Sequence, residues 1–352
     1  MVSNFVTIPF SMATARKSLE TDSVDPQIWL AQILRNRFDK IVELYSAPLE
    51  HPRDEGVHDM RVSIRRLRSA LRDFAQLTDK IPLKKIRTRL KFLADLLGEV
   101  RDLDVAIDAF TKASKEAKSS NIKKGIAEIV KDCNVKRAEA YDRLKEHLVR
   151  EDLADLTKQF DRAFERSLRQ REIFAAAGVN EAARVMIENR LDRFLGEIDA
   201  LYDPFAVRRI HSLRIAGKHL RYSIELFGDL WDGKLRPFVD ETKKMQSYLG
   251  DLHDRDFWIA GSSKRISAER PRSKRDEMIY QARIWLLSEF TRQRMNAYRR
   301  ALETWSDWRG NDFPGRLRKC SRISVTCTTE IFGSRGRANA FRRSVREASP
   351  KR

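Results

Sequence analysis

The sequence predicts an all-α protein, and three observations lead to this prediction. The chain has 352 residues but only 14 Gly and 10 Pro, whereas the helix-favouring Leu, Ala, Arg, Glu and Lys dominate. Amphipathic segments follow one another from about residue 25 to Trp308. No stretch alternates apolar and polar residues between hairpin turns, as paired strands would. A chain of this length can bury a substantial core.

The order of the elements follows from their start and stop signals. Asp25 and Pro26 suit the N-cap and first turn of a helix that continues through IWLAQILRNRFDKIVELY. Later breaks are expected where Gly, Pro, Ser, Asn and Asp gather, at 46–56, 78–82, 119–125, 177–180, 203–204, 232–237 and 261–271. We expect 1–25 to be a loose arm, because its basic residues follow its apolar part, opposite to a secretory signal. We expect 312–352, rich in Ser, Thr, Gly and Arg, to be a disordered basic tail.

Three sequence blocks recur in the same order. NRFDKIV at Asn36 returns as NRLDRFL at Asn189, and HDMRVSIRRLRSALRDF at His58 returns as HSLRIAGKHLRYSIELF at His211. LGEVRDLDV at Leu97 returns as LGDLHDRDF at Leu249. Such a repeat indicates two similar helical units, here 26–177 and 178–311, each expected to be a four-helix bundle.

The second block carries an unusual row of cationic side chains. At 100° per residue, five of them fall within about 80° of one another on the helix: His58, Arg61, Arg65, Arg68 and Arg72. The same positions of the second copy hold His211, Arg214, Lys218, Arg221 and Glu225. We call these two rows the basic ridges. Like charges three or four residues apart destabilise a helix by a few tenths of a kcal/mol. A solvated charged face is the ordinary explanation, but the duplication and the net charge of +19 favour a polyanionic partner.

The third block supplies repeated acidic residues, namely Asp102, Asp104, Asp254 and Asp256. They could form salt bridges with arginines of the second block or, as D-x-D, bind a divalent metal. We favour salt bridges and expect no metal. His253 suggests an HD-type hydrolase, but the equivalent residue of the first copy is Arg101. A phosphoryl-carrier histidine would leave the second copy unexplained.

The remaining sequence features indicate no enzyme and no cofactor. GxxxxGK[ST], GxGxxG and GxSxG are absent from the sequence. The three cysteines show neither CxxC nor zinc spacing, which suits a reducing cytoplasm. No apolar run is long enough to span a membrane. We therefore expect a cytoplasmic binding protein.

The paired motifs H-x-x-R-x-x-x-[RK]-x-x-R and LGxxxDxD resemble those of the CHAD family, the conserved histidine α-helical domain, over residues 26–310. The resemblance implies two pseudo-symmetric four-helix bundles, with a basic cleft or pore between them that binds inorganic polyphosphate without catalysis. It also implies association with polyphosphate granules. The implied ligand-facing residues are His58, Arg61, Arg65, Arg68, Arg72, His211, Arg214, Lys218 and Arg221, with Lys91 and Lys243 as second-tier candidates.

The chain departs from the family's pattern in two ways. Glu225 stands where the first copy has Arg72, so the two halves are not expected to bind equally. Some family members carry a triphosphatase-type domain, which we do not expect here because no E-x-E-x-K motif is present.

A nonspecific nucleic-acid-binding protein that uses the ridges and tail is the alternative function. Nucleic-acid binders usually add stacking aromatic residues or side chains that read a groove. The spacing of the tryptophans suggests neither, whereas polyphosphate offers only oxygens and requires only Arg and Lys. Polyphosphate is therefore the favoured ligand.

Overall fold

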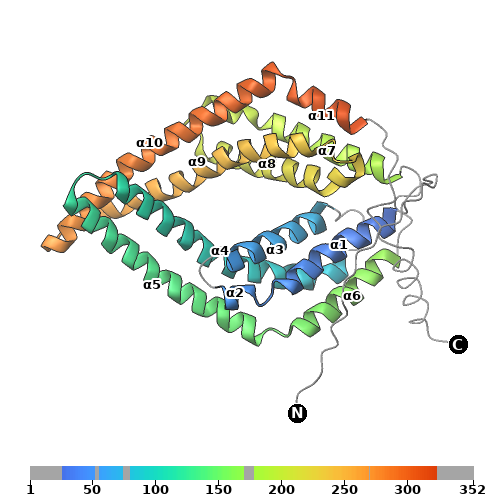
Figure 1. The fold of residues 1–352 in the computed structure, drawn as a ribbon, viewed down its shortest axis with the longest axis horizontal. Helices are drawn as coiled ribbons and strands as arrows, with labels where there is room; N and C mark the ends of the chain where they lie inside the picture. Colours follow the sequence, from blue (N-terminus) through green and yellow to red (C-terminus); the bar gives the residue numbers. More distant parts are fainter. Residues whose placement is uncertain (1–25, 52–54, 74–79, 170–177, 269, 323–352) are drawn as a thin grey trace, which may run out of the picture. The chain divides into compact units, whose positions relative to one another are not determined.

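The computed structural model describes residues 26–51, 55–73, 80–169, 178–268 and 270–322. Within these ranges the chain is helical except for short connections and contains no strand, which confirms the all-α prediction (Figure 1). The first half forms α1 (Pro26–Glu43), α2 (Ala47–Glu50), α3 (Glu55–Asp73), α4 (Lys80–Glu116), α5 (Ser120–Arg150) and α6 (Leu153–Arg169). The second half forms α7 (Gly178–Gly196), η1 (Ile198–Tyr202), α8 (Val207–Phe227), η2 (Gly228–Trp231), α9 (Arg236–Ala268), α10 (Lys274–Gly310) and α11 (Phe313–Arg322).

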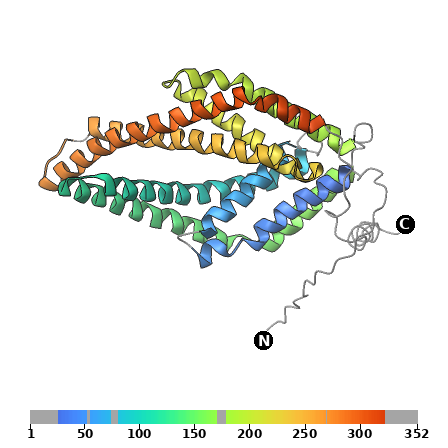
Figure 2. The same ribbon diagram turned by 45° about the horizontal axis from the view of Figure 1, so that its top comes forward.

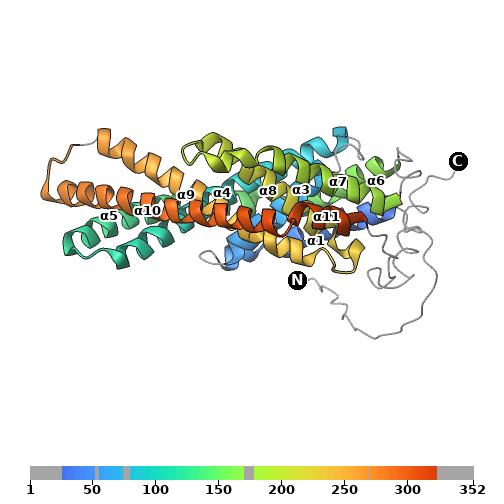
Figure 3. The same ribbon diagram turned by 90° about the horizontal axis from the view of Figure 1, so that it is seen from above.

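The helices of the two halves contact one another in a similar order. In the first half α3 lies against α1 and α4, and α4 also lies against α5. In the second half α8 lies against α7 and α9, and α9 lies along α10 (Figures 2 and 3). This order follows the sequence repeat. That the halves are pseudo-symmetric four-helix bundles stays a prediction.

Two predicted boundaries are wrong. Gly261 does not end a helix, because α9 continues to Ala268; a helical glycine costs about 1 kcal/mol, which packing along a long helix can offset. Residues 313–322 belong not to a disordered tail but to α11, where Phe313 and Leu317 are fully buried. Phe313 stacks on Trp308 with ring centroids 3.9 Å apart. Residues 1–25 and 323–352, for which we predicted an arm and a tail, lie outside the described residues.

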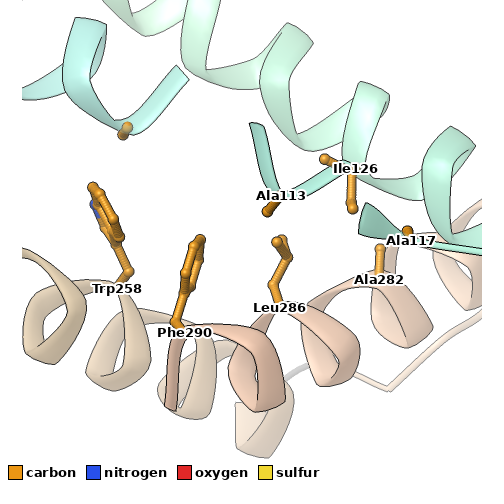
Figure 4. Packing of buried hydrophobic residues seen from close by; sticks show 8 residues of the cluster. Ala113, Ala117, Ile126, Trp258, Ala282, Leu286 and Phe290 are labelled. Atoms are coloured by element: carbon orange, nitrogen blue, oxygen red, sulfur yellow. The ribbon is translucent and has the colours of Figure 1, made fainter. Parts of the chain in front are cut away.

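One apolar cluster joins the two halves of the repeat. Its buried members come from α4, the connection that follows it, α5, α9 and α10 (Figure 4): Ala106, Ala113, Ala117, Ile126, Trp258, Ala282, Leu286 and Phe290. Gly125 lets α5 pass close to α10, since a β-carbon there would collide with the carbonyl of Met278. The described residues from Pro26 to Arg322 belong to one compact unit, and the predicted division at 177/178 stays a prediction.

Candidate anion-binding site

The two basic ridges face each other where α3 contacts α8. The Arg65 guanidinium of α3 lies 5.6 Å from the ring centroid of Tyr222 on α8. Lys218 of α8 experiences the charges of Arg61, Arg65 and Arg72 of α3. The structure thus brings together two cationic segments that are far apart in the sequence. Their equivalent first residues, His58 and His211, are separated by 153 positions.

A pocket of about 540 Å³ opens beside these ridges. Its lining includes Ser69, Thr88 and Tyr222, and seven cationic side chains: Arg65, Arg68, Arg72, Lys84, Arg87, Lys91 and Lys218. None of the described residues that line it is acidic. We call this cavity the cationic pocket. It is a concentrated positive site without an internal counter-ion in its lining.

Helix α4 contributes three of these cations, two of which the sequence analysis missed. Lys84, Arg87 and Lys91 are three and four residues apart and therefore share one helix face. This spacing was visible in the sequence, but nothing local shows that this face of α4 meets the α3 ridge. Lys243, the repeat equivalent of Lys91, is exposed on α9 and is not among the described lining residues.

The crowding of cations in a partly buried site lowers their proton affinity. Burial, followed by the charges of Arg65 and Arg214, lowers the pKa of Lys218 to about 8. Burial also lowers the pKa of Arg65 and that of Arg214. Burial and neighbouring positive charges both disfavour the charged form of a lysine or arginine side chain. A bound anion would favour the charged forms through its opposite charge.

The first acidic residue of each D-x-D lies beside the ridges. Asp102 pairs with Arg61 at 3.3 Å, as predicted, but its side chain is 71% exposed, so the pair stabilises the fold little. Burial raises the pKa of Asp254, against the opposing charges of Arg255 and Arg214.

The second acidic residue of each D-x-D makes a different pairing from the one we predicted. Asp104 accepts a hydrogen bond from Arg137 of α5 at 2.7 Å, and Asp256 accepts one from Arg294 of α10. Two residues correspond to 200° around a helix, so these carboxylates point away from Asp102 and Asp254. Their partners are consequently arginines of the next helix rather than of the second block. Among the described residues, no group of three or more His, Cys, Asp or Glu side chains could hold a metal ion.

The two ridge histidines lie apart from the cationic pocket. His58 lines another cavity of about 790 Å³, together with His51, Arg101 and Asp104. It is fourteen residues, or about 21 Å along the helix, from Arg72. Burial and the charge of Arg101 lower the pKa of His58. His211 lies with its ring centroid 4.9 Å from that of His253, and burial and Arg214 lower its pKa.

The predicted mismatch between the repeats lies at the C-terminal ends of the ridges. Arg72 lines the cationic pocket and donates a hydrogen bond to Ser69 Oγ at 2.9 Å. On α8, Glu225 pairs instead with Arg221, whose Nε lies 3.4 Å from Oε1. Arg221 also lies over the Tyr222 ring, 4.9 Å from its centroid. Glu225 therefore partly neutralises the C-terminal end of the second ridge.

These features define an all-helical protein whose facing basic helices form a positively charged pocket. A family model described as the CHAD domain matches residues 32–260, and the chain belongs to this family. No curated protein matches the sequence significantly.

Two solved structures share the fold. The crystal structure of the CHAD domain from the plant Ricinus communis has 22% sequence identity and a TM-score of 0.63, covering 82% of this chain and 94% of that one. PptA from Streptomyces chartreusis has 16% identity and a TM-score of 0.61, covering 80% of this chain and 99% of the other. At these identities the likeness concerns the fold alone. Across the described helices, none is long and apolar enough to cross a membrane.

Proposed function

We propose that this protein binds inorganic polyphosphate in the cationic pocket and along the basic ridges, without catalysing a reaction on it. The observation that carries the proposal is the lining of the pocket: seven cationic side chains and no acidic one among its described residues. Membership of the CHAD family, which is associated with polyphosphate, supports the same function. We further propose a cytoplasmic protein that joins polyphosphate granules.

The chemistry of the pocket matches that of the ligand. Each phosphoryl unit carries roughly one negative charge and offers only oxygen acceptors. One arginine guanidinium can donate two parallel hydrogen bonds to two of these oxygens. The cationic form of Lys218, disfavoured in the empty pocket, would be stabilised by the anion. Binding would thereby relieve the repulsion between the ridges.

The pocket suits a nucleic acid less well, because its described lining residues offer no surface for base stacking. Its aromatic residue, Tyr222, is only 4% exposed, and two guanidiniums lie over its ring. Single-stranded nucleic acid is usually held by aromatic rings on which bases stack. This observation favours polyphosphate over the alternative ligand.

Titration with polyphosphates of graded length tests the proposal. We expect the affinity to rise with chain length and then level off when the pocket and ridges are filled. Lys91→Gln should weaken binding of long chains, whereas Lys243→Gln is the matched control, because the equivalent lysine lies outside the pocket. Equal affinities for short and long chains, or equal losses in the two variants, would contradict the proposal. We expect no release of orthophosphate.

Competition with DNA separates polyphosphate binding from general polyanion binding. At equal phosphate concentration, long-chain polyphosphate should displace DNA, and the reverse result would favour the nucleic-acid function. A chain ending at Arg322 should lose DNA affinity more than polyphosphate affinity. The truncation must leave 313–322 intact, because α11 is packed against α7 and α10.

A further inference from the structure

Besides His219 Nδ1 and Ser223 Oγ, four buried polar groups on the facing helices α3 and α8 have no hydrogen-bond partner among the described residues. They are the hydroxyl of Tyr222 and the Nε groups of Arg65, Arg214 and Arg221. Arg221 Nε forms its ion pair with Glu225 without hydrogen-bond geometry. Buried polar groups are nearly always hydrogen-bonded, so several unsatisfied ones together require an explanation.

The four groups share one chemical property, since each can donate a hydrogen bond. A guanidinium N–H only donates, and the tyrosine hydroxyl can donate as well as accept. The three guanidinium groups therefore lack acceptors, and an acceptor would also satisfy the hydroxyl. The nearby Ser69 Oγ already accepts a hydrogen bond from Arg72.

Tyr222 lies at the centre of this group and contributes to the cationic pocket. It lines the pocket with Arg65 and Lys218, and its ring contacts the guanidiniums of Arg65 and Arg221. Burial lowers the pKa of both Arg65 and Arg214, and Tyr222 opposes this effect in each case. The Tyr222 side chain therefore lies among cations at the pocket, with its hydroxyl unpartnered.

We propose that Tyr222 is a specificity-determining residue, whose hydroxyl donates a hydrogen bond to an unesterified oxygen of a phosphoryl unit bound in the cationic pocket. The arginines supply the charge, and their contact with the ring holds the ring in place. This inference rests on the proposed function and names a residue that charge patterning does not reveal. The matching ligand group is an ionised phosphoryl unit, because it presents acceptors only.

A structural water is the competing partner for this hydroxyl. A gap of about 10 Å³, lined by Ser69, Glu225 and Tyr222 among others, is just large enough for one. If water fills it, removal of the hydroxyl would leave the ligand unaffected. The two explanations therefore differ in a measurable way.

The test compares Tyr222→Phe with the matched variant Tyr45→Phe. Tyr45 also buries a hydroxyl without a hydrogen-bond partner, but this hydroxyl lies near Arg89 and Glu151, outside the pocket lining. Phenylalanine keeps the ring and its contacts with arginine. We expect Tyr222→Phe to raise the Kd for long-chain polyphosphate about tenfold, as loss of a hydrogen bond to a charged group does. Tyr45→Phe should leave the Kd unchanged.

Two further readouts separate a ligand contact from a structural effect. The salt dependence of binding should be the same in Tyr222→Phe as in the wild type, because no charge is removed. Its ligand-free melting temperature should equal or exceed that of the wild type, while the shift caused by polyphosphate should shrink. A Kd within twofold of the wild-type value overturns the assignment of Tyr222 in favour of the water. Absence of binding by the wild type overturns the proposed function itself.

Discussion

The cationic residues of the pocket are not equivalent, because one of them can lose its proton near neutral pH. The arginines stay charged under all physiological conditions. Lys218 differs, since burial and the surrounding guanidiniums lower its pKa to about 8. The charge of a lysine with such a lowered pKa depends strongly on a nearby anion, because the anion raises the pKa again.

This titration predicts an alkaline loss of affinity. Free Lys218 deprotonates near pH 8, while the bound form holds its proton to a higher pH. Binding is therefore coupled to proton uptake, and the affinity for polyphosphate should fall as pH rises above about 8. Lys218→Arg should abolish this fall, as isothermal titration calorimetry across the range would show. An identical alkaline fall in that variant would rule out Lys218 as its cause.

The lowered pKa values of the two ridge histidines predict a second pH dependence of polyphosphate affinity, at acidic pH. The pKa of His58 and that of His211 are both lowered, so the free protein holds them neutral near pH 7. A neighbouring phosphate favours the cation, so affinity should rise as pH falls through the bound-state pKa and level off below the free-state pKa, which is under 6.5.

Replacement of both histidines by glutamine should flatten this acidic rise. Binding is best measured with long chains, because few of their phosphates are terminal groups that titrate near pH 6. Arg68→Gln is the control, since it should lower affinity equally at every pH. An unchanged pH profile in the double variant would assign the histidines a structural role.

At the scale of elements, two buried ion pairs connect α4 to α5 and α9 to α10. Arg137 and Asp104 lie 2.7 Å apart with side chains 11% and 15% exposed. Arg294 and Asp256 form the equivalent pair, and Arg294 also donates to the carbonyl of Pro204 at 2.7 Å. The pairs recur because the D-x-D motif recurs, and they join the helices that hold the apolar cluster.

Asp256→Ala should destabilise the protein by about 3 kcal/mol, because it leaves the buried charge of Arg294 without its counter-ion. The exposed pair of Lys136 and Asp132, at 2.6 Å, offers a control. Lys136→Ala should cost less than about 1 kcal/mol. Urea denaturation measures both values. Similar losses for the two variants would show that burial does not set the strength of these pairs.

Helix α11 is packed against the rest of the fold, so replacing its buried aromatic residue should lower the free energy of unfolding strongly. Phe313 is fully buried between Trp308 and Phe238. Phe313→Ala should cost about 3–5 kcal/mol of unfolding free energy. Lys319→Ala, an exposed change on the same helix, should stay within about 0.5 kcal/mol. A minor effect of Phe313→Ala in urea denaturation would mean that α11 is dispensable.

At the scale of the whole molecule, the pocket predicts how salt weakens binding. Seven cations line it, and each neutralised phosphate contributes about −0.7 to the slope of log K against log salt for a single-stranded polyanion. The slope should therefore be about −5. Without Lys84 and Arg87 it should be about −3.5, so Lys84→Gln with Arg87→Gln tests the contribution of α4. A wild-type slope near −1 would exclude an extended site.

Much of this architecture could be predicted from the sequence, because its signals are local. Apolar spacing predicted the helices, and the repeated blocks predicted two matched basic ridges. Asp102 pairs with the ridge as expected. The failures came where packing outweighs local preference: Gly261 remains within α9, and Phe313 begins a helix because Trp308 and Phe238 cover it.

The sequence by itself determined the all-α class, the family and the positive ridges. The spacing of apolar residues and the spacing of charges are local patterns that involve only neighbouring residues. Only the tertiary structure decided which cations meet. Among the described residues, it added Lys84 and Arg87 to the pocket, placed Lys243 and His58 outside its lining, and left the Tyr222 hydroxyl without a hydrogen-bond partner. These outcomes depend on how helices distant in sequence rotate and pack against one another, which no single helix encodes.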